Sequence, residues 1–291
     1  MRFLRPHSWA EALDLRAAYP DATVICGGTD VMVELNYDRR RPSALLDLTG
    51  CPEPAVVERA GDGVVRLGAA VTYTRIVREL SELTPGLAQA ARTVGSPQIR
   101  NRGTVGGNLG AASPAGDSHP PLLATGAVVE AESAARGIRT IPIDDFYAGP
   151  KRHTLAADEL IRAIRVPVAA GPQYFAKVGT RNAMVIAVCS FALALDRTTR
   201  TAGTGIGSAG PTPLRATAAE DFLAAALPWN DPAPLPESVL REFGSLVASA
   251  ARPIDDVRGT ADYRTHALAV LARRTLTWAW ADHRTSNRRA A

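Results

Sequence analysis

The first half of the chain mixes the spacing of apolar residues typical of helices with that typical of strands. Ser8, followed three residues later by Glu11, marks the start of a helix over residues 8–18. Short apolar runs predict strands at 22–26, 44–49 and 63–71, and amphipathic runs predict helices at 72–80 and 87–94. A long loop is expected from Gly95 to Pro121. The pattern therefore predicts a mixed α and β structure.

The second half changes character near residue 170. Before that point, strands are expected at 125–133, 137–144 and 158–167. After it, three apolar runs predict an antiparallel sheet at 174–178, 184–196 and 202–210, followed by helices at 215–226, 236–250 and 262–283. We expect a domain over residues 1–172, a second domain over 173–285 and a tail over 286–291.

Charge and cysteine content narrow the function classes. The 33 basic and 29 acidic residues give a net charge of +4 and are spread along the chain, which argues against nucleic acid or an anionic membrane as partner. No apolar run approaches the roughly 20 residues that span a bilayer, and the N-terminus lacks a secretory leader. The three cysteines have no Cys-x-x-Cys spacing, so no metal site is expected. These features predict a cytoplasmic protein with buried thiols.

Two glycine pairs carry the main functional signal. Gly27-Gly28 and Gly106-Gly107 each have a threonine beside them and a small polar residue nearby. Glycine lets backbone N–H groups close on a ligand, and concave sets of such groups bind phosphate. Either pair alone fits an ordinary turn, whereas the two together predict two sides of one diphosphate site. Neither pair forms a Gly-x-Gly-x-x-Gly fingerprint or a P-loop, which disfavours a Rossmann domain.

Asp117 is the candidate for recognising the rest of a nucleotide. A carboxylate can accept hydrogen bonds from ribose hydroxyls or a base amino group, although a turn or helix cap is an equal alternative. His119 stands among prolines and is interpreted as structural. The chain has no Ser-His-Asp set, metal-ligand cluster or paired carboxylates in helical register. We therefore expect no catalytic residue, and a bound cofactor that carries the chemistry.

Five stretches in order along the chain resemble the FAD-binding medium subunit of the molybdenum hydroxylases, a family that includes the xanthine dehydrogenase and carbon monoxide dehydrogenase flavoproteins. The stretches are CGGTDVMVELN at 26, SPQIRNRGTVGGNLGAASPAGDSHPPLLATGA at 96, LAADELIRAIRVP at 155, GIGSAGPTPLRATAAE at 205 and DDVRGTADYRTHALAVLARRTL at 255. The resemblance implies an α+β fold. It would have a two-part FAD-binding domain of the vanillyl-alcohol oxidase type, followed by a carbon monoxide dehydrogenase flavoprotein-like domain of a three-stranded antiparallel sheet with helices.

The resemblance also implies which residues hold FAD. Those of the first loop are Val24, Ile25, Cys26, Gly27, Gly28, Thr29, Asp30 and Val31. Those of the second loop are Thr104, Val105, Gly106, Gly107 and Asn108. Asp117 corresponds to an aspartate on the adenosine half of FAD, while Ile161 and Lys177 fall where similar proteins place residues against the cofactor. The two glycine loops, and the lack of a His or Cys that the motifs would place to tether a flavin ring, predict that FAD is bound without a covalent link.

The implied function is electron relay within a heterotrimer. Partner subunits would carry the other centres: a large subunit with molybdopterin and a small subunit with 2Fe–2S clusters. FAD would pass electrons to an external acceptor such as NAD, a quinone or oxygen. Two alternatives stay open at this point: a stand-alone FAD-dependent reductase resembling the enolpyruvyl-UDP-sugar reductases, and a flavin-free assembly module. The substrate of the complex is not encoded in this chain.

Overall fold

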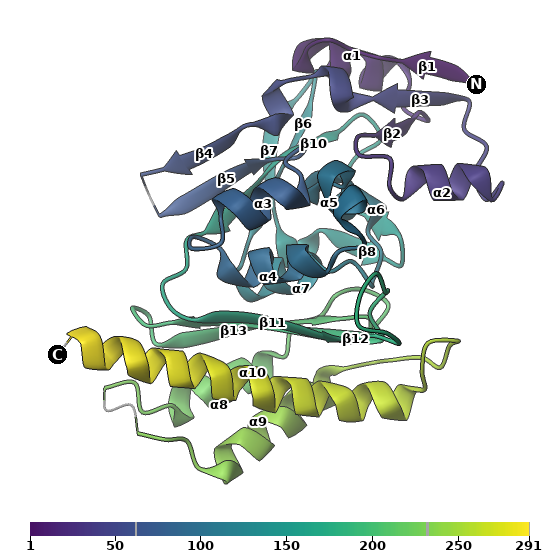
Figure 1. Cartoon of the computed structure of the whole chain (residues 1–291). Helices are drawn as coiled ribbons and strands as arrows, with labels where there is room; N and C mark the ends of the chain where they lie inside the picture. Colours follow the sequence, from purple (N-terminus) through teal and green to yellow (C-terminus); the bar gives the residue numbers. More distant parts are fainter. Residues whose placement is uncertain (62, 231–232, 291) are drawn as a thin grey trace.

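The computed structural model describes residues 1–61, 63–230 and 233–290, and for residues 60 and 286–290 it describes the backbone alone. The chain begins with a small sheet of order β1-β3-β2, with β3 parallel to both neighbours (Figure 1). Its elements are β1 (Arg2–Leu4), α1 (Trp9–Ala18), β2 (Thr23–Ile25), α2 (Val31–Asn36) and β3 (Ala44–Asp47). Ser8 caps α1 by accepting a hydrogen bond from the Glu11 N–H at 3.2 Å, which confirms the predicted helix start.

A five-stranded antiparallel sheet of order β4-β5-β10-β6-β7 forms the second part of the N-terminal region. Its strands are β4 (Val57–Ala60), β5 (Val64–Gly68), β6 (Val128–Ser133), β7 (Gly137–Pro142) and β10 (Leu160–Pro167). A small hairpin of β8 (Tyr147–Gly149) and β9 (Arg152–His153) precedes β10, and short 3-10 helices occupy Leu48–Gly50, Glu53–Ala55 and Ile143–Asp145. The central strand β10 is interrupted by a register shift between Ile161 and Ala163.

Helices cover this sheet, and three of them correct the expected loop. The helices are α3 (Tyr73–Glu79), α4 (Pro85–Thr93), α5 (Pro97–Arg102), α6 (Val105–Ala111) and α7 (His119–Ala124). The loop expected from Gly95 to Pro121 was therefore wrong. Ser96 and Thr104 cap α5 and α6 through their hydroxyl groups, and proline stands in the first turn of α5 and α7. Caps and N-terminal proline favour helices despite the high glycine content.

The C-terminal region has the predicted three-stranded antiparallel sheet and three helices. The strands are β11 (Gln173–Val178), β12 (Cys189–Asp196) and β13 (Thr201–Gly207), and the helices are α8 (Thr217–Ala226), α9 (Glu237–Ala250) and α10 (Ala261–Ala290). Figure 1 shows this sheet between α4 and α7 on one side and α8, α9 and α10 on the other. Of the tail expected over residues 286–291, the structure describes only the backbone of residues 286–290, which belongs to α10.

The two regions pack closely along the sheet. A Cβ atom on Gly203 would overlap the Ala124 carbonyl oxygen, so glycine in β13 lets α7 approach the strand. Gln89 of α4 accepts a hydrogen bond from the Phe175 N–H at 2.8 Å, and the Gly86 N–H donates to the Gln173 side chain at 3.3 Å. The first contact satisfies one backbone N–H at the edge of β11, and both contacts hold β11 beside α4.

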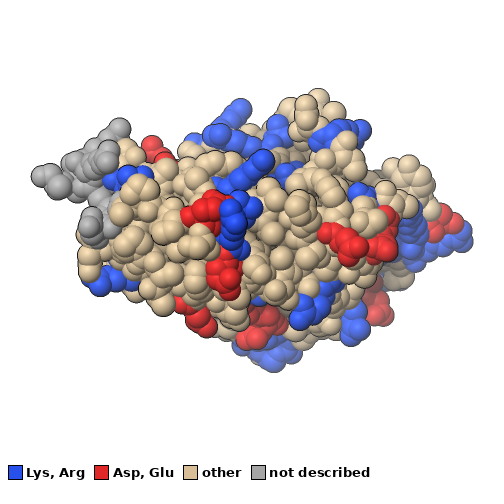
Figure 2. Space-filling view, turned by 90° about the horizontal axis from the view of Figure 1, so that it is seen from below, with Lys and Arg blue, Asp and Glu red and all other residues tan. Residues whose placement is uncertain are grey.

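The face built by the C-terminal helices carries charges of both signs. Figure 2 shows basic and acidic side chains interspersed over this face, with a large uncharged area between them. Glu237 accepts hydrogen bonds from both Arg241 and Arg273, at 3.1 Å and 2.6 Å. Among the side chains that the structure describes, no large field of a single sign forms on this face. Within the described ranges, no helix is sufficiently long and apolar to cross a membrane.

Candidate cofactor site

The first glycine loop connects β2 to α2 and leaves its backbone donors open. Gly28 has φ +74°, in the left-handed region that favours glycine. Its carbonyl accepts the Met32 N–H at 3.1 Å, so the chain turns directly into α2. In the part of the chain that the structure describes, the N–H groups of Gly28, Thr29, Asp30 and Val31 have no protein acceptor. Successive free N–H groups around a left-handed residue form an anion-binding concavity.

The structure brings the two glycine loops together. A Cβ atom on Gly27 would overlap the Arg102 carbonyl oxygen at the end of α5. The Thr29 hydroxyl lies 3.4 Å from the position that a Cβ atom on Gly103 would take. Burial raises the pKa of the Cys26 thiol, and a hydrogen bond with the Thr104 side chain opposes this rise. The first loop therefore lies against the junction of α5 and α6.

The second glycine loop is the first turn of α6, and its donors are occupied. The Val105 and Gly106 N–H groups donate to Val71 and Ala69 at 3.1 and 3.0 Å. The Gly107 N–H donates to the Thr104 hydroxyl at 3.0 Å, and the Asn108 N–H donates to the Thr104 carbonyl at 3.0 Å. The free donors expected from this pair are thus used inside the protein. What the loop offers instead is a helix surface without side chains.

That bare surface consists of Gly107 and Gly110, which are both exposed. A Cβ atom on Gly110 would have one neighbour within 4 Å, Ile161 Cδ1 at 3.9 Å. Gly106 differs, because a Cβ atom there would lie 2.5 Å from Ala69 Cβ and 2.6 Å from its carbonyl oxygen. Gly106 serves helix-to-sheet packing, whereas Gly110 leaves space on the outer face. A Cβ atom on Gly107 would lie 2.9 Å from the Thr104 hydroxyl that caps α6. Gly110 was not a sequence candidate, since a lone glycine carries little signal.

Asp117 lies in the turn before α7 and is 9% exposed. Its Oδ2 accepts hydrogen bonds from Lys177 Nζ at 2.6 Å and from the Thr93 hydroxyl at 3.3 Å. Its Oδ1 is buried and has no partner among the described residues. Burial raises the pKa of Asp117, and the charge and hydrogen bond of Lys177 oppose this rise. Thr93, at the end of α4, was not anticipated as part of this group.

His119 is structural, as the sequence suggested. It is fully buried, and its Nδ1 lies 2.7 Å from the Tyr147 hydroxyl. Burial lowers the pKa of His119 to about 3, so the ring is neutral near pH 7. The neighbouring Ser118 donates to Asn108 Oδ1 at 2.5 Å, which fixes the Asn108 side chain across the turn. The contacts of His119 and Ser118 fix the position of the turn that carries Asp117.

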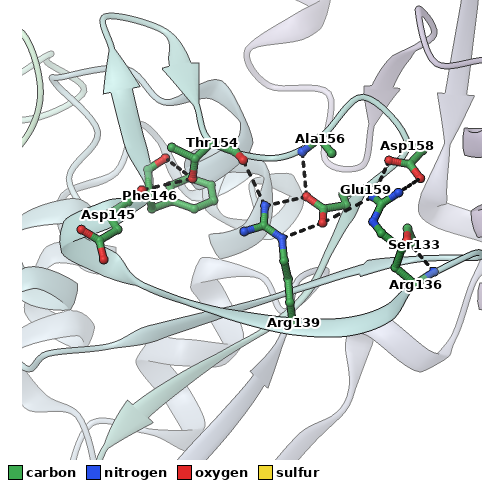
Figure 3. A network of polar contacts seen from close by, with 9 residues as sticks. All are labelled: Ser133, Arg136, Arg139, Asp145, Phe146, Thr154, Ala156, Asp158 and Glu159. Atoms are coloured by element: carbon green, nitrogen blue, oxygen red, sulfur yellow. Dashed lines mark hydrogen bonds and ion pairs between the residues drawn. The ribbon is translucent and has the colours of Figure 1, made fainter.

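Ile161 belongs to β10, and an ion-pair network fixes the chain just before it (Figure 3). Glu159 accepts hydrogen bonds from Arg139 Nε at 2.7 Å and from the Ala156 N–H at 2.7 Å. The hydrogen bond from Arg139 lowers the pKa of Glu159 and keeps the buried carboxylate ionised. Arg136 makes a bidentate pair with Asp158 at 2.6 and 2.8 Å. The network anchors the start of β10, which places Ile161 beside Gly110.

The remaining sequence candidates lie at the edges of this arrangement. Val24 and Ile25 are in β2, paired with β3, and Val31 opens α2. Lys151, which was not a sequence candidate, lies at the tip of the β8–β9 hairpin and contacts both α2, which follows the first glycine loop, and the end of α6, which contains the second. Its Nζ lies 2.5 Å from Glu34 in α2, and its N–H donates to Ala112 after α6 at 3.0 Å. Within the described ranges, no group of three or more His, Cys, Asp or Glu could hold a metal.

These features together fit a dinucleotide. Open backbone N–H groups suit a diphosphate, a bare helix face leaves space for a ligand, and the partnerless Asp117 oxygen suits a hydroxyl or amino donor. The fold and site together define a two-region protein with a candidate dinucleotide site. Comparison with known proteins identifies the family.

The chain belongs to the FAD-binding subunits of the molybdopterin dehydrogenases. Residues 1–169 match the family described as the FAD binding domain in molybdopterin dehydrogenase. Residues 174–279 match the CO dehydrogenase flavoprotein C-terminal domain. The predicted family, the predicted fold class and FAD as the cofactor of this chain are confirmed, and the protein is an oxidoreductase subunit. The exact boundary expected at residues 172 and 173 stays a prediction.

Relatives match over nearly the whole chain. The xanthine dehydrogenase FAD-binding subunit of Escherichia coli O157:H7 is 30% identical over 282 residues, covering 94% of each protein. The nicotine 6-hydroxylase medium subunit of Paenarthrobacter nicotinovorans is 33% identical over 288 residues, covering 97% of this chain and 98% of the relative. In a structure of carbon monoxide dehydrogenase from Hydrogenophaga pseudoflava, the matching chain superposes with a TM-score of 0.88 at 27% identity, covering 97% of this chain and 98% of that one.

Proposed function

We propose that this chain relays electrons in a molybdenum hydroxylase complex, from the iron–sulfur clusters of a partner subunit through FAD to an external acceptor. The observation that carries the proposal is a site with cofactor-binding groups in which, among the described residues, neither His119 nor Lys177 is placed to act as a general base. His119 is buried with a pKa near 3, and Lys177 Nζ donates to three protein oxygens. Bound FAD supplies one-electron and two-electron redox chemistry.

The residues of this chain would bind and orient the cofactor. We assign the diphosphate to the first loop, from Val24 to Val31, whose open N–H groups favour an anion. The second loop, from Thr104 to Asn108, would supply the bare helix face beside it. Asp117 would accept a hydrogen bond from the adenosine half, and Ile161 would contact the cofactor beside Gly110. Lys177 belongs to the site through its contact with Asp117.

The proposed partners are a large molybdopterin subunit and a small iron–sulfur subunit, in a heterotrimeric unit. Relatives that match over most of their length are named as the medium subunit of a nicotine 6-hydroxylase, subunit beta of a caffeine dehydrogenase and the medium chain of a carbon monoxide dehydrogenase. Such variety fits a shared relay chain whose complexes differ in another subunit. The acceptor would be NAD, a quinone or oxygen. A cytoplasmic location agrees with the three free thiols.

The test is substrate-driven flavin reduction. Co-express the chain with the products of neighbouring genes, isolate the complex, and follow flavin absorbance under anaerobic conditions after adding candidate substrates. We expect bleaching of the flavin in the complex, and none in the isolated chain loaded with FAD. An isolated chain that reduces or oxidises an organic substrate at a rate unchanged by its partners would contradict the relay and favour the stand-alone reductase.

A further inference from the structure

Helix α2 follows the first glycine loop directly and packs loosely against the rest of the molecule. None of its six residues is buried, and the side chains of Met32 and Val33 are largely exposed, at 43% and 47%. Two left-handed backbone positions flank the helix, Gly28 at φ +74° and Asp38 at φ +54°. Figure 1 shows α2 at the right-hand edge of the molecule. A segment with few buried contacts can open at low cost in free energy.

The backbone hydrogen bonds around α2 stay within residues 28–42, which we call the α2 segment. The Met32 N–H donates to the Gly28 carbonyl at 3.1 Å, and the Arg39 N–H donates to the Glu34 carbonyl at 2.8 Å. Among the described residues, one hydrogen bond joins the α2 segment to the rest of the chain, from Lys151 Nζ to Glu34 Oε1 at 2.5 Å. This ion pair is therefore the polar attachment of the segment.

The other end of this ion pair is attached to α6. Lys151 lies at the tip of the β8–β9 hairpin, and its N–H donates to the Ala112 carbonyl at 3.0 Å, just after α6. The hydrogen bond from Lys151 lowers the pKa of Glu34, so the carboxylate is ionised near pH 7. Arg40 lies 3.3 Å from the other oxygen of Glu34, but it belongs to the α2 segment itself. Lys151 alone thus connects α2 with the helix that has the glycine face.

We propose that the α2 segment is a flap over the cofactor site and that the Lys151–Glu34 pair is its clasp, which sets how fast FAD enters and leaves. The inference rests on the proposed FAD site, because the flap begins at the open N–H groups of the first loop and the clasp ends beside α6. Both partners are protein side chains, so the pair is the same in the free and the bound chain.

The clasp has a kinetic signature that separates it from a ligand contact. Opening the flap breaks the ion pair whether FAD is entering or leaving. A contact that is equal in the free and bound states cannot change the affinity, because a ligand shifts an equilibrium only by its differential interactions. Loss of the pair should therefore raise the rates of FAD binding and release together and leave the dissociation constant nearly unchanged.

The test compares Lys151→Met with wild type in the full-length chain, isolated with its co-expressed partners. Exchange of bound FAD against excess radiolabelled FAD gives the release rate. Stopped-flow fluorescence of FAD added to flavin-depleted protein gives the binding rate. Exposed ion pairs contribute modestly, so we expect both rates to rise about threefold to fivefold, with a dissociation constant within about twofold of wild type. Wild-type rates in the variant would overturn the proposal.

Arg40→Met is the matched control. Arg40 contacts the same carboxylate without joining the flap to the hairpin, so its loss should leave both rates unchanged. A control that exchanges FAD as fast as Lys151→Met would show that the surroundings of Glu34, and not the clasp, govern exchange. If Lys151 instead binds a phosphate of FAD directly, Lys151→Met should bind FAD more slowly and release it faster. The resulting rise in the dissociation constant would also overturn the flap.

Glu34→Gln covers the case in which Lys151→Met does not fold, because it keeps the side-chain shape and removes the charge at the other end of the clasp. It should raise both rates by a similar factor. The double variant should show no more than the larger single effect, since the two residues act as one unit, and additive changes would refute the clasp. Wild type that binds no FAD contradicts the proposed site as well, whereas bound FAD with unchanged rates in the variants contradicts the flap alone.

Discussion

The two glycine pairs have the same sequence signature and opposite structural roles. In the first loop, glycine allows a left-handed turn at Gly28, after which several N–H groups have no protein acceptor among the described residues. In the second, every N–H group from Val105 to Asn108 is bonded within the protein. The glycines there remove side chains: Gly106 toward the sheet, and Gly107 and Gly110 toward the outside. One loop supplies donors and the other supplies space.

This difference explains how a diphosphate site is built without a Rossmann fingerprint. The first loop lies against the α5–α6 junction because Gly27 admits the Arg102 carbonyl. Its open donors are therefore held near the bare face of α6. A ligand in this position would contact backbone N–H groups on one side and the glycine face of α6 on the other. Substitutions at single glycines separate the packing role from the binding role.

The largest effect is expected from Gly106→Val, which tests the packing role. The new Cβ would lie 2.5–2.7 Å from the Cβ, Cα and carbonyl oxygen of Ala69, two of which are backbone atoms. Overpacking of this kind typically costs 1–3 kcal/mol and sometimes more, so we expect a loss of about 3 kcal/mol in the free energy of unfolding. Urea denaturation followed by circular dichroism measures it. Wild-type stability would show that α6 does not pack on the sheet as described.

A smaller effect, on binding, is expected from Gly110→Leu. The outer face of α6 has space for the side chain in the absence of a ligand, so folding should be preserved. A leucine there would occupy the space assigned to FAD, and we expect at least a tenfold loss in FAD affinity, about 1.4 kcal/mol. Gly61→Leu is the matched control, because Gly61 is also exposed and has no neighbour within 4 Å. Unchanged flavin content in Gly110→Leu would show that FAD does not cover this face.

The C-terminal fold was predictable because each of its strands and helices corresponds to a long apolar or amphipathic run in the sequence. The apolar runs that became β11, β12 and β13 are separated by turn residues. The helices α8 and α9 begin and end within two residues of the expected positions, and α10 begins one residue early but continues to Ala290, beyond the expected end at residue 283. The helices α5, α6 and α7 were missed because they have six or seven residues and contain proline or several glycines. Their caps, Ser96 and Thr104, were present in the sequence as a weaker signal.

The candidate site was predictable in its residues and not in its geometry. The sequence around Gly106 and Gly107 cannot show that their backbone N–H groups already donate hydrogen bonds within the protein. One acceptor, Ala69, lies more than thirty positions earlier along the chain, and proximity of this kind arises from folding. The contact between Lys177 and Asp117 also arises only from folding, because the two residues are 60 positions apart in the sequence. Nothing local in the sequence indicates that pairing.

The smallest effect is expected from Gly28→Ala, which tests the donor role of the first loop. A methyl group would fit sterically, because its nearest neighbours, Ile25 Cδ1 and Met32 Cγ, would lie at 3.4 Å. The backbone at φ +74° is unfavourable for alanine, which costs about 1 kcal/mol. If the loop keeps its shape, unfolding experiments should show that loss of stability and FAD affinity should hardly change. If the loop relaxes to negative φ instead, stability should be near wild type, and FAD affinity should fall because the N–H groups no longer converge. Wild-type values for both quantities would show that the left-handed turn at Gly28 is not needed, and would remove the basis for assigning the diphosphate to this loop.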